Sequence, residues 1–323
     1  MKEAKIKTSE NKKFIILSAV TVAIVTVMVL FSVLFKNKEI IFPEIAAISV
    51  GAFIAPKFKW KTSYFRMVLF ITICAISGIM IVRFVPLDKP VQLLIAFILG
   101  QLIFLFSGTS FAPMISAIVL PVMLGTESMV YLVAAFSLTL VIVLVRALTD
   151  RLGLTECEKF EAVERNVKYE VLTFVYRTVI MLVLCYFGYL FKMNFIIAPP
   201  LLVLFTELSG VRKEGEINPV KVVGSVFLCA VAGAFSRVLI CNYMHLPLYV
   251  AAFAVGILMI VILRNFKAFL PPAGALGVLA LLIDEKSVYT YPLQILAGVA
   301  IYVAAVLALQ FILKVRRIIL SYQ

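Results

Sequence analysis

The sequence predicts an all-α, polytopic integral membrane protein, and its composition, its apolar runs and the placement of its charges each point to this class. Of the 323 residues, 63% are hydrophobic and only 15% are charged, and the mean hydropathy is +1.12. Soluble domains are roughly 45–50% apolar and about 25% charged, so this composition excludes an ordinary soluble domain. Apolar runs of about 15–22 residues recur along the chain, as a hydrocarbon core about 30 Å thick requires.

Twelve apolar runs predict about 12 transmembrane helices, six on each side of a charged linker. The runs cover residues 14–35, 40–55, 65–85, 91–106, 111–124, 129–148, 169–191, 195–208, 220–240, 248–263, 269–283 and 293–313. We therefore expect a first six-span repeat with a short basic N-terminus at 1–149, a charged cytoplasmic linker at 150–168, and a second six-span repeat at 169–323. The first run is too long for a signal-peptide core and no small-x-small cleavage site follows it, so we expect an uncleaved helix.

The positive charge of the chain predicts its orientation. There are 30 Lys and Arg against 17 Asp and Glu, a formal net charge of +13. Cytoplasmic segments are enriched in Lys and Arg, and the N-terminal segment, the linker and alternate loops of this chain together carry most of these residues. In the loops and at the C-terminus they are Lys57, Lys59, Lys61, Arg66, Arg212, Lys213, Lys221, Arg264, Lys267, Lys314, Arg316 and Arg317. Both termini are therefore expected in the cytoplasm of a cell with the protein in its plasma membrane. Topology accounts for most of the charge, so the expected partner is the lipid bilayer and no nucleic acid.

The two halves resemble each other at a spacing of about 155 to 159 residues, which predicts an internal repeat. A shift of 155 lays residues 67–78 (MVLFITICAISG) on 222–233 (VVGSVFLCAVAG). A shift of 159 lays Phe111-Ala112-Pro113 on Leu270-Pro271-Pro272. Because each half has an even number of spans, the two six-helix repeats are expected to be parallel, related by an axis near the membrane normal. Chance alignment of two apolar strings is the alternative.

The second and fifth spans of each half are short and marked by proline. Such paired, interrupted spans indicate a transport site, because their half-helices leave backbone N–H groups that favour an anion. A span of about 14 residues covers only ~21 Å at 1.5 Å per residue, so half-spans are expected. A kink buried by neighbours is the alternative. The candidate path residues of the fifth spans are Thr109, Ser110, Pro113, Pro271, Pro272, Ala273, Gly274 and Ala275.

Ionisable residues inside the predicted spans are the second group of candidates, since a charge at the bilayer centre costs about 2.5–3.5 kcal/mol even on insertion scales. Glu44 and Glu207 lie in the second spans, and we expect both to face the protein interior. Arg177 and Arg237 are either parts of an anion path, paired with these carboxylates, or snorkelling side chains. Gln101 and Gln294 are neutral candidates for a polar lining.

The second half resembles the HPP family of integral membrane proteins. The resemblance covers residues 195–313 and rests on residues 269–277 (FLPPAGALG), which are similar to the HPPAGA signature of that family. Leu270 stands where the family has its name-giving histidine, and residues 111–113 of the first half depart further. Family members have one such unit with four or five spans, and some are associated with nitrite transport, so the resemblance implies a tandem version that carries a small anion. A weaker similarity is to aromatic-acid exporters of the fusaric-acid-resistance type.

The expected function is therefore a transporter or permease for a small anion, such as nitrite or a small organic acid, with its site between the two repeats. A non-transporting membrane partner protein and an aromatic-acid or organic-acid exporter are the alternatives. We expect that the protein is not an enzyme and that it binds no cofactor and no metal. The chain has one histidine, no HExxH motif and no GxxxxGK[ST] motif. Its five cysteines predict no disulfide framework. A homo-oligomer is possible for such a protein.

Reporter fusions test the predicted topology. A topology reporter fused after Lys36 and one fused after Arg212 should lie on opposite sides of the membrane, because an odd number of spans separates the two positions. Activity of the two fusions on the same side would contradict the topology.

Overall fold

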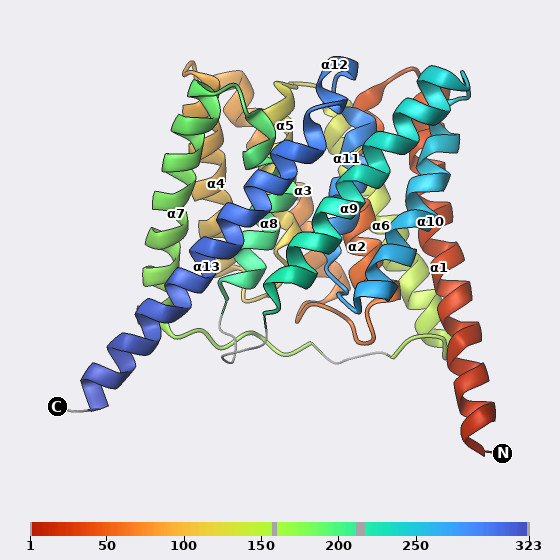
Figure 1. Cartoon of the computed structure of the whole chain (residues 1–323), viewed down its shortest axis with the longest axis horizontal. Coiled ribbons are helices and arrows are strands. Elements are labelled where there is room, and N and C mark those ends of the chain that lie inside the picture. The colour runs from red at the N-terminus through yellow and green to blue at the C-terminus, as the bar shows by residue number, and fades with distance from the viewer. Residues whose placement is uncertain (1, 157–159, 211–216, 322–323) are drawn as a thin grey trace.

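The computed structural model describes residues 2–156, 160–210 and 217–321, and these residues form helices without a β-strand. Arg212 and Lys213, which the sequence analysis named, lie outside the described residues. Among the described residues, eight helices are long and apolar enough to cross a membrane. They are α1 (Lys2–Leu34), α3 (Tyr64–Phe84), α4 (Lys89–Phe106), α6 (Met129–Arg151), α7 (Val167–Leu190), α9 (Pro219–Arg237), α10 (Leu248–Phe266) and α13 (Tyr291–Ser321). Both termini lie at the same end of the molecule (Figure 1).

The second and fifth runs of each half form short helices. They are α2 (Glu44–Ser49), continued by the π-helical η2 (Val50–Ile54), and α5 (Pro113–Leu124), α8 (Pro199–Leu208) and α11 (Pro271–Leu282). At 1.5 Å per residue, α5 and α11 extend only about 18 Å, less than a hydrocarbon core of about 30 Å. The second and fifth helices of each half are therefore short, as the sequence predicted. The count of twelve membrane spans stays a prediction. The remaining pieces are η1 (Lys38–Ile40), η3 (Asn194–Ile197), η4 (Val238–Tyr243) and α12 (Glu285–Val288).

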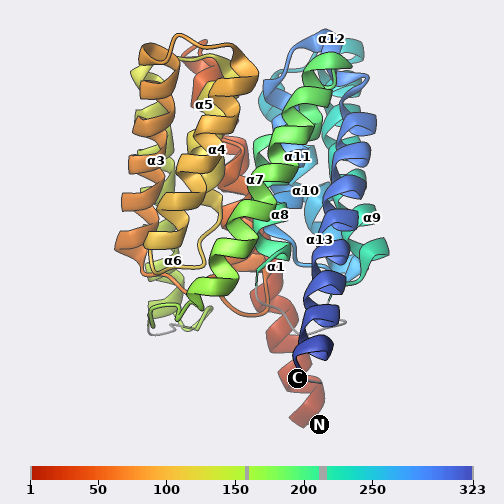
Figure 2. The same cartoon turned by 90° about the vertical axis from the view of Figure 1, so that its left-hand side faces the viewer.

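The short helices form the core and the long helices surround them (Figures 1 and 2). Every residue of α2, η2 and α11 is buried. The long helices instead leave apolar side chains such as Phe65, Phe106 and Phe311 on the outer surface, where lipid would cover them. Among the short helices, α11 packs mainly on α2 and α5 mainly on α8, so the core joins the first half to the second.

Close helix contacts recur in the two halves. A Cβ atom at Gly78 of α3 would lie 2.4 Å from the carbonyl oxygen of Ile118 in α5. One at Gly233 of α9 would lie 2.1 Å from the carbonyl oxygen of Gly277 in α11. Each pair of positions is related by the shifts of 155 and 159 residues, and only glycine permits this approach of two backbones.

A tyrosine contact recurs in the same way. The Tyr131 hydroxyl donates to the carbonyl oxygen of Ala117 at 2.9 Å, and the Tyr291 hydroxyl donates to that of Leu276 at 2.6 Å. Both tyrosine rings meet a phenylalanine edge-on, with centroids 5.8 Å apart for Phe42 and 5.3 Å apart for Phe195. Left-handed backbone also recurs, at Lys36 and Lys192 and at Gly108 and Lys267. The two halves therefore have matching local structure at matching positions.

Arginine side chains satisfy carbonyl groups where the core helices break. Arg146 of α6 donates to the carbonyl oxygen of Ala52 in η2. Arg237 of α9 donates to the carbonyl oxygens of Ala280, at 2.8 Å, and Ile283 at the end of α11. The last carbonyl groups of a helix have no partner within it, and none is available from hydrocarbon. Arg237, a path candidate from the sequence, therefore serves the end of α11.

Alanine at the glycine contact tests the packing of α9 on α11. Gly233→Ala should lower the free energy of unfolding by about 1–3 kcal/mol, because its methyl group would press on backbone atoms that cannot turn away. Gly188→Ala is the matched control, since a Cβ there has its nearest neighbours at an ordinary 3.4 Å. Thermal unfolding in detergent measures both variants. An unchanged midpoint for Gly233→Ala would contradict the close approach of the two helices.

Candidate functional site

Two cavities lie at opposite ends of one interface between the halves. We call the end with both termini the inner end and the opposite end, which carries α12, the outer end (Figure 1). Helices α4 of the first half and α7 of the second half line both cavities, the end of α5 lines the outer cavity, and the end of α8 and the segment before α5 line the inner cavity. The interface between the halves is therefore hollowed at both ends.

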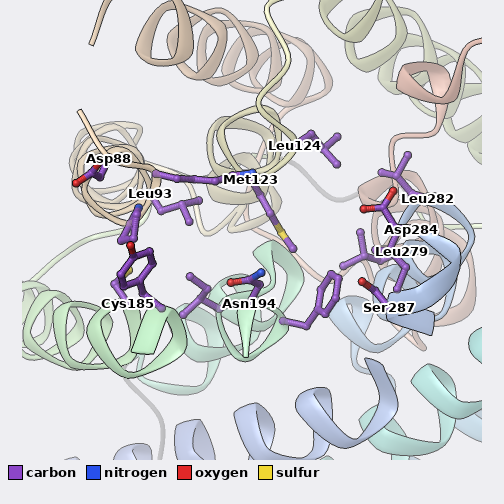
Figure 3. Close-up of a pocket in the computed structure, with 16 residues that line it drawn as sticks. Asp88, Leu93, Met123, Leu124, Cys185, Asn194, Leu279, Leu282, Asp284 and Ser287 are labelled. Atoms are coloured by element: carbon purple, nitrogen blue, oxygen red, sulfur yellow. The ribbon is translucent and has the colours of Figure 1, made fainter. Parts of the chain in front are cut away.

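The outer cavity has a volume of about 530 Å³. Figure 3 shows the side chain of Met123 from α5 and that of Asn194 from η3 reaching towards its middle from opposite walls. Its charged side chains are Asp88 and Lys89 at the start of α4 and Asp284 after α11. The full lining is Asp88, Lys89, Pro90, Leu93, Met123, Leu124, Cys185, Tyr189, Asn194, Phe195, Ile197, Leu279, Leu282, Ile283, Asp284 and Ser287.

The inner cavity is smaller, about 310 Å³, and more polar in its residues. The linker segment before α7 covers it on one side, and the N-terminal end of α5 and the C-terminal end of α8 lie on the others. Its lining is Lys59, Trp60, Phe104, Ser110, Ala112, Val163, Glu164, Arg165, Glu170, Arg177, Thr206, Glu207 and Gly210.

The same faces of α4 and α7 line both cavities. On α7, Arg177 lines the inner cavity and Cys185 the outer cavity, and Met181 lies midway at the four-residue spacing of one helix face. On α4, Phe97 lies between Leu93, which lines the outer cavity, and Phe104, which lines the inner cavity. Met181 and Phe97 are both 0% exposed. Eight residues of α7 extend about 12 Å, so a closed apolar barrier of about two helical turns separates the cavities.

Arg177 lies at the floor of the inner cavity and is 3% exposed. Its guanidinium donates to the Gln101 side-chain oxygen at 3.0 Å, to the Ser209 hydroxyl at 2.7 Å and to the Thr206 carbonyl oxygen at 3.2 Å. The Gln101 amide in turn donates to the Thr206 hydroxyl at 2.6 Å. This network joins α4 of the first half to α7 and α8 of the second half.

The network contains no carboxylate, and Glu170, the carboxylate that acts on Arg177 at longer range, already forms an ion pair with Arg165. Among the described residues, the ion pairs join Arg146 to Asp150 and Arg165 to Glu170, and none includes Arg177. A guanidinium has five N–H donors, and neutral groups take three of them here. A buried cation with spare donors is a site at which an anion gains both charge compensation and hydrogen bonds.

The other charges of the inner cavity are nearer its mouth. Glu164 is exposed and Lys59 is half-buried, and the side chains of Arg165 and Glu170 form an ion pair at 3.2 Å. Counting Lys59, Arg165 and Arg177 against Glu164, Glu170 and Glu207, the lining has no net charge. The deep part of the cavity is nevertheless positive at Arg177, because water screens the charges at the mouth more than it screens a buried charge.

Trp60 is a buried aromatic residue in the lining of the inner cavity. It is 3% exposed, and its indole N–H donates to the Glu207 carboxylate at 2.9 Å. Its ring meets that of Phe111 edge-on at 5.2 Å. A Cβ at Gly51 would lie 2.2 Å from the indole, so glycine makes room for it. The contact with Glu207 joins the two halves at the inner end.

The structure brings some of the candidate residues together and keeps others apart. Arg177, Glu207 and Ser110 share the inner cavity, and Thr109 is buried beside it with Pro113 as the first residue of α5. Glu44 lies elsewhere, buried against Ser116 of α5. Gln294 accepts the N–H of Phe195. Neither Arg177 nor Arg237 forms an ion pair with Glu44 or Glu207 among the described residues.

The PPAGA segment lies in packed core. Pro271, Pro272, Ala273, Gly274 and Ala275 are all buried in the first turns of α11. A Cβ at Gly274 would lie 3.3 Å from side-chain atoms of Val50 and Met259 and 3.5 Å from the Ala46 carbonyl oxygen. A bulky residue at position 274 would therefore press on α2 and test folding, in addition to any effect on a path.

Sequence reasoning did not single out Trp60, Phe97, Met181, Thr206 or Ser209. Trp60 carried a signal, because it is the single tryptophan of the chain and lies between two lysines in a predicted inner loop. The other four are ordinary residues of apolar helices.

No family model matches the chain, and comparison with curated proteins and with solved structures found no match either. The resemblance of residues 269–277 to the HPP signature therefore stays a prediction.

Fluorescence of Trp60 tests whether the inner cavity binds an anion. Adding nitrite or benzoate to the purified protein should change the Trp60 emission saturably. Arg177→Gln should weaken the apparent affinity at least about tenfold, since a hydrogen bond to a charged group contributes about 1.5–3 kcal/mol. Arg264→Gln is the control, because Arg264 lies over Phe14 on another face of the protein. Equal titrations of the wild type and Arg177→Gln would contradict an anion site at Arg177.

Proposed function

We propose that this chain is a membrane carrier for a small anion, with its path between α4 and α5 of the first half and α7 and α8 of the second. The observation that carries the proposal is the pair of cavities on the same faces of α4 and α7, with Arg177 on the inner side of the barrier. A carrier exposes its binding site to only one side of the membrane at a time. A thin barrier between two cavities is the arrangement that such alternating access requires. A membrane protein without a transport role would have no use for this polar cavity, which speaks against a purely structural partner.

We further propose that the twelve helices are two parallel copies of one six-helix unit. The recurring Gly78 and Gly233 contacts, the Tyr131 and Tyr291 hydrogen bonds, and the packing of α4 on α7 and of α10 on α1 support this proposal. In parallel repeats, substrate sites lie near the midplane between the halves. A cytoplasmic inner end agrees with the excess of Lys and Arg in its loops.

An organic acid is a second candidate substrate beside an inorganic anion such as nitrite. Trp60 and Phe104 line the inner cavity together with Arg177. Aromatic rings beside a guanidinium suit a carboxylate with an apolar body, because the rings pack on the body while the guanidinium binds the charge. Competition between benzoate and nitrite distinguishes the two candidates. If the substrate is an organic acid, benzoate should bind more tightly than nitrite, because its ring packs on the aromatic side chains.

Uptake into reconstituted vesicles tests the proposed function. The wild type should take up radiolabelled benzoate or isotopically labelled nitrite, and Arg177→Gln should reduce the rate at least about tenfold by removing charge-assisted hydrogen bonds to the anion. Arg177→Lys keeps the charge without the planar fork and should lie between the two. Arg264→Gln should keep the wild-type rate. Full uptake by Arg177→Gln would move the path elsewhere, and absence of uptake of both anions by the wild type would count against the proposed substrates.

A further inference from the structure

We propose that Glu44 is a proton-binding site in the interior of the membrane part, and that its proton couples to movement of the core helices. The binding of the proton follows from the surroundings of Glu44 alone. The coupling to transport rests on the proposed function.

Glu44 is a carboxyl group buried between two short helices. It is the first residue of α2 and is 1% exposed. One carboxyl oxygen, Oε1, accepts a hydrogen bond from the Ser116 hydroxyl of α5. The other, Oε2, is buried and has no hydrogen-bond partner among the described residues. The group therefore has one free oxygen in a part of the protein that water does not reach.

No cation among the described residues neutralises this carboxyl group. Helix α2 packs on α1, α5, α6 and α11 and continues into η2. The sequences of α5, α11 and η2 contain no titratable residue, and neither does the segment 14–34 of α1. From α6, Arg146 is directed to Ala52 at the far end of η2 and to Asp150.

In the part of the chain that the structure describes, the titratable groups on which Glu44 acts electrostatically are tyrosines. They are Tyr131 of α6 and Tyr291 of α13, which occupy matching positions in the two halves. Their hydroxyl groups donate to the carbonyl oxygens of Ala117 and Leu276. Neither hydroxyl carries a positive charge, so neither compensates an ionised Glu44.

A proton fits this site better than a metal ion. A buried carboxylate without a cationic partner is disfavoured and becomes neutral by binding a proton. A hard metal ion would need several oxygen ligands around it, and no group of three or more acidic, histidine or cysteine side chains suited to a metal occurs among the described residues. None of the cavities described above is lined by Glu44. A proton needs only the free oxygen.

The position of Glu44 connects its proton to the proposed path. Its hydrogen bond with Ser116 joins α2 to α5. Ala112, which precedes α5, lines the inner cavity, and Met123, near the end of α5, lines the outer cavity. When the carboxylate binds a proton at Oε2, the net charge of the site changes from −1 to 0 and no other bond changes. Loss of that proton leaves a charge that favours movement of α2 and α5 towards water. The protonation state thereby favours one arrangement of α5 over another.

Infrared spectroscopy tests the proton directly. In lipid nanodiscs, the wild type should show a carbonyl stretching band of a protonated carboxylic acid that disappears at high pH, and Glu44→Gln should lack this band. Glu44→Gln keeps the shape of the side chain and an oxygen for Ser116. Ser116→Ala should keep the band but shift it, because the hydrogen bond is removed while the acid stays. Identical difference spectra for the wild type and Glu44→Gln would overturn the proposal that Glu44 binds a proton.

Uptake under an imposed pH gradient tests the coupling. In vesicles, a pH gradient should accelerate benzoate or nitrite uptake severalfold in the wild type and leave uptake by Glu44→Gln unchanged, while Glu44→Gln still exchanges labelled for unlabelled anion. Equal stimulation of both proteins would overturn the coupling. If the wild type transports neither anion but shows the infrared band, the proposed function fails for these substrates and the proton site stands.

Discussion

The constraint on which this structure depends is that backbone groups cannot stay unpaired in hydrocarbon. Four short helices end within the protein, and each end leaves N–H or carbonyl groups without a partner inside the helix. The long helices bury these ends, and the buried arginines donate to the exposed carbonyl groups. Arg146 does so for η2, Arg237 for α11 and Arg177 for α8. A helix end and a buried cation therefore occur together at three of the four short helices, whereas α5 ends at Gly125, whose N–H donates to the carbonyl oxygens of Pro121 and Val122.

Arg177 differs from the other two arginines because the equivalent position in the first half has different surroundings. Under the proposed repeat, the positions that correspond to Arg177 and Gln101 are Thr21 and Ile260. There α1 packs directly on α10, with a Cβ at Gly256 only 3.3 Å from Val22. The α1/α10 interface also has a cavity, of about 650 Å³, but its lining is mainly apolar and its one charged residue, Arg264, is exposed. The other interface has the buried cation Arg177 beside its cavities. The buried cation is therefore the feature that distinguishes the proposed path.

The helices were predictable from the sequence, whereas their neighbours were not. Run lengths and prolines predicted the short second and fifth helices, because length against bilayer thickness is a property of one segment. The depth of Arg177 was also readable from its distance to the start of its run. Its partners were not: pairing with a glutamate was one expectation, and the structure instead gives Gln101, Thr206 and Ser209. In a chain that is apolar on most helix faces, periodicity does not show which face meets which helix, so Phe97 and Met181 stayed hidden.

The central claim is that one barrier separates two cavities on the same helix faces. Accessibility of introduced cysteines to a membrane-impermeant thiol reagent tests it most directly, in a background without native cysteines. Leu93→Cys should react only from the outer side, Phe104→Cys only from the inner side, and Phe97→Cys from neither unless benzoate or nitrite is present to drive exchange between states. Ile257→Cys on α10 should be insensitive to the anion. Reaction of Leu93→Cys and Phe104→Cys from the same side, or no effect of either anion at position 97, would contradict the account.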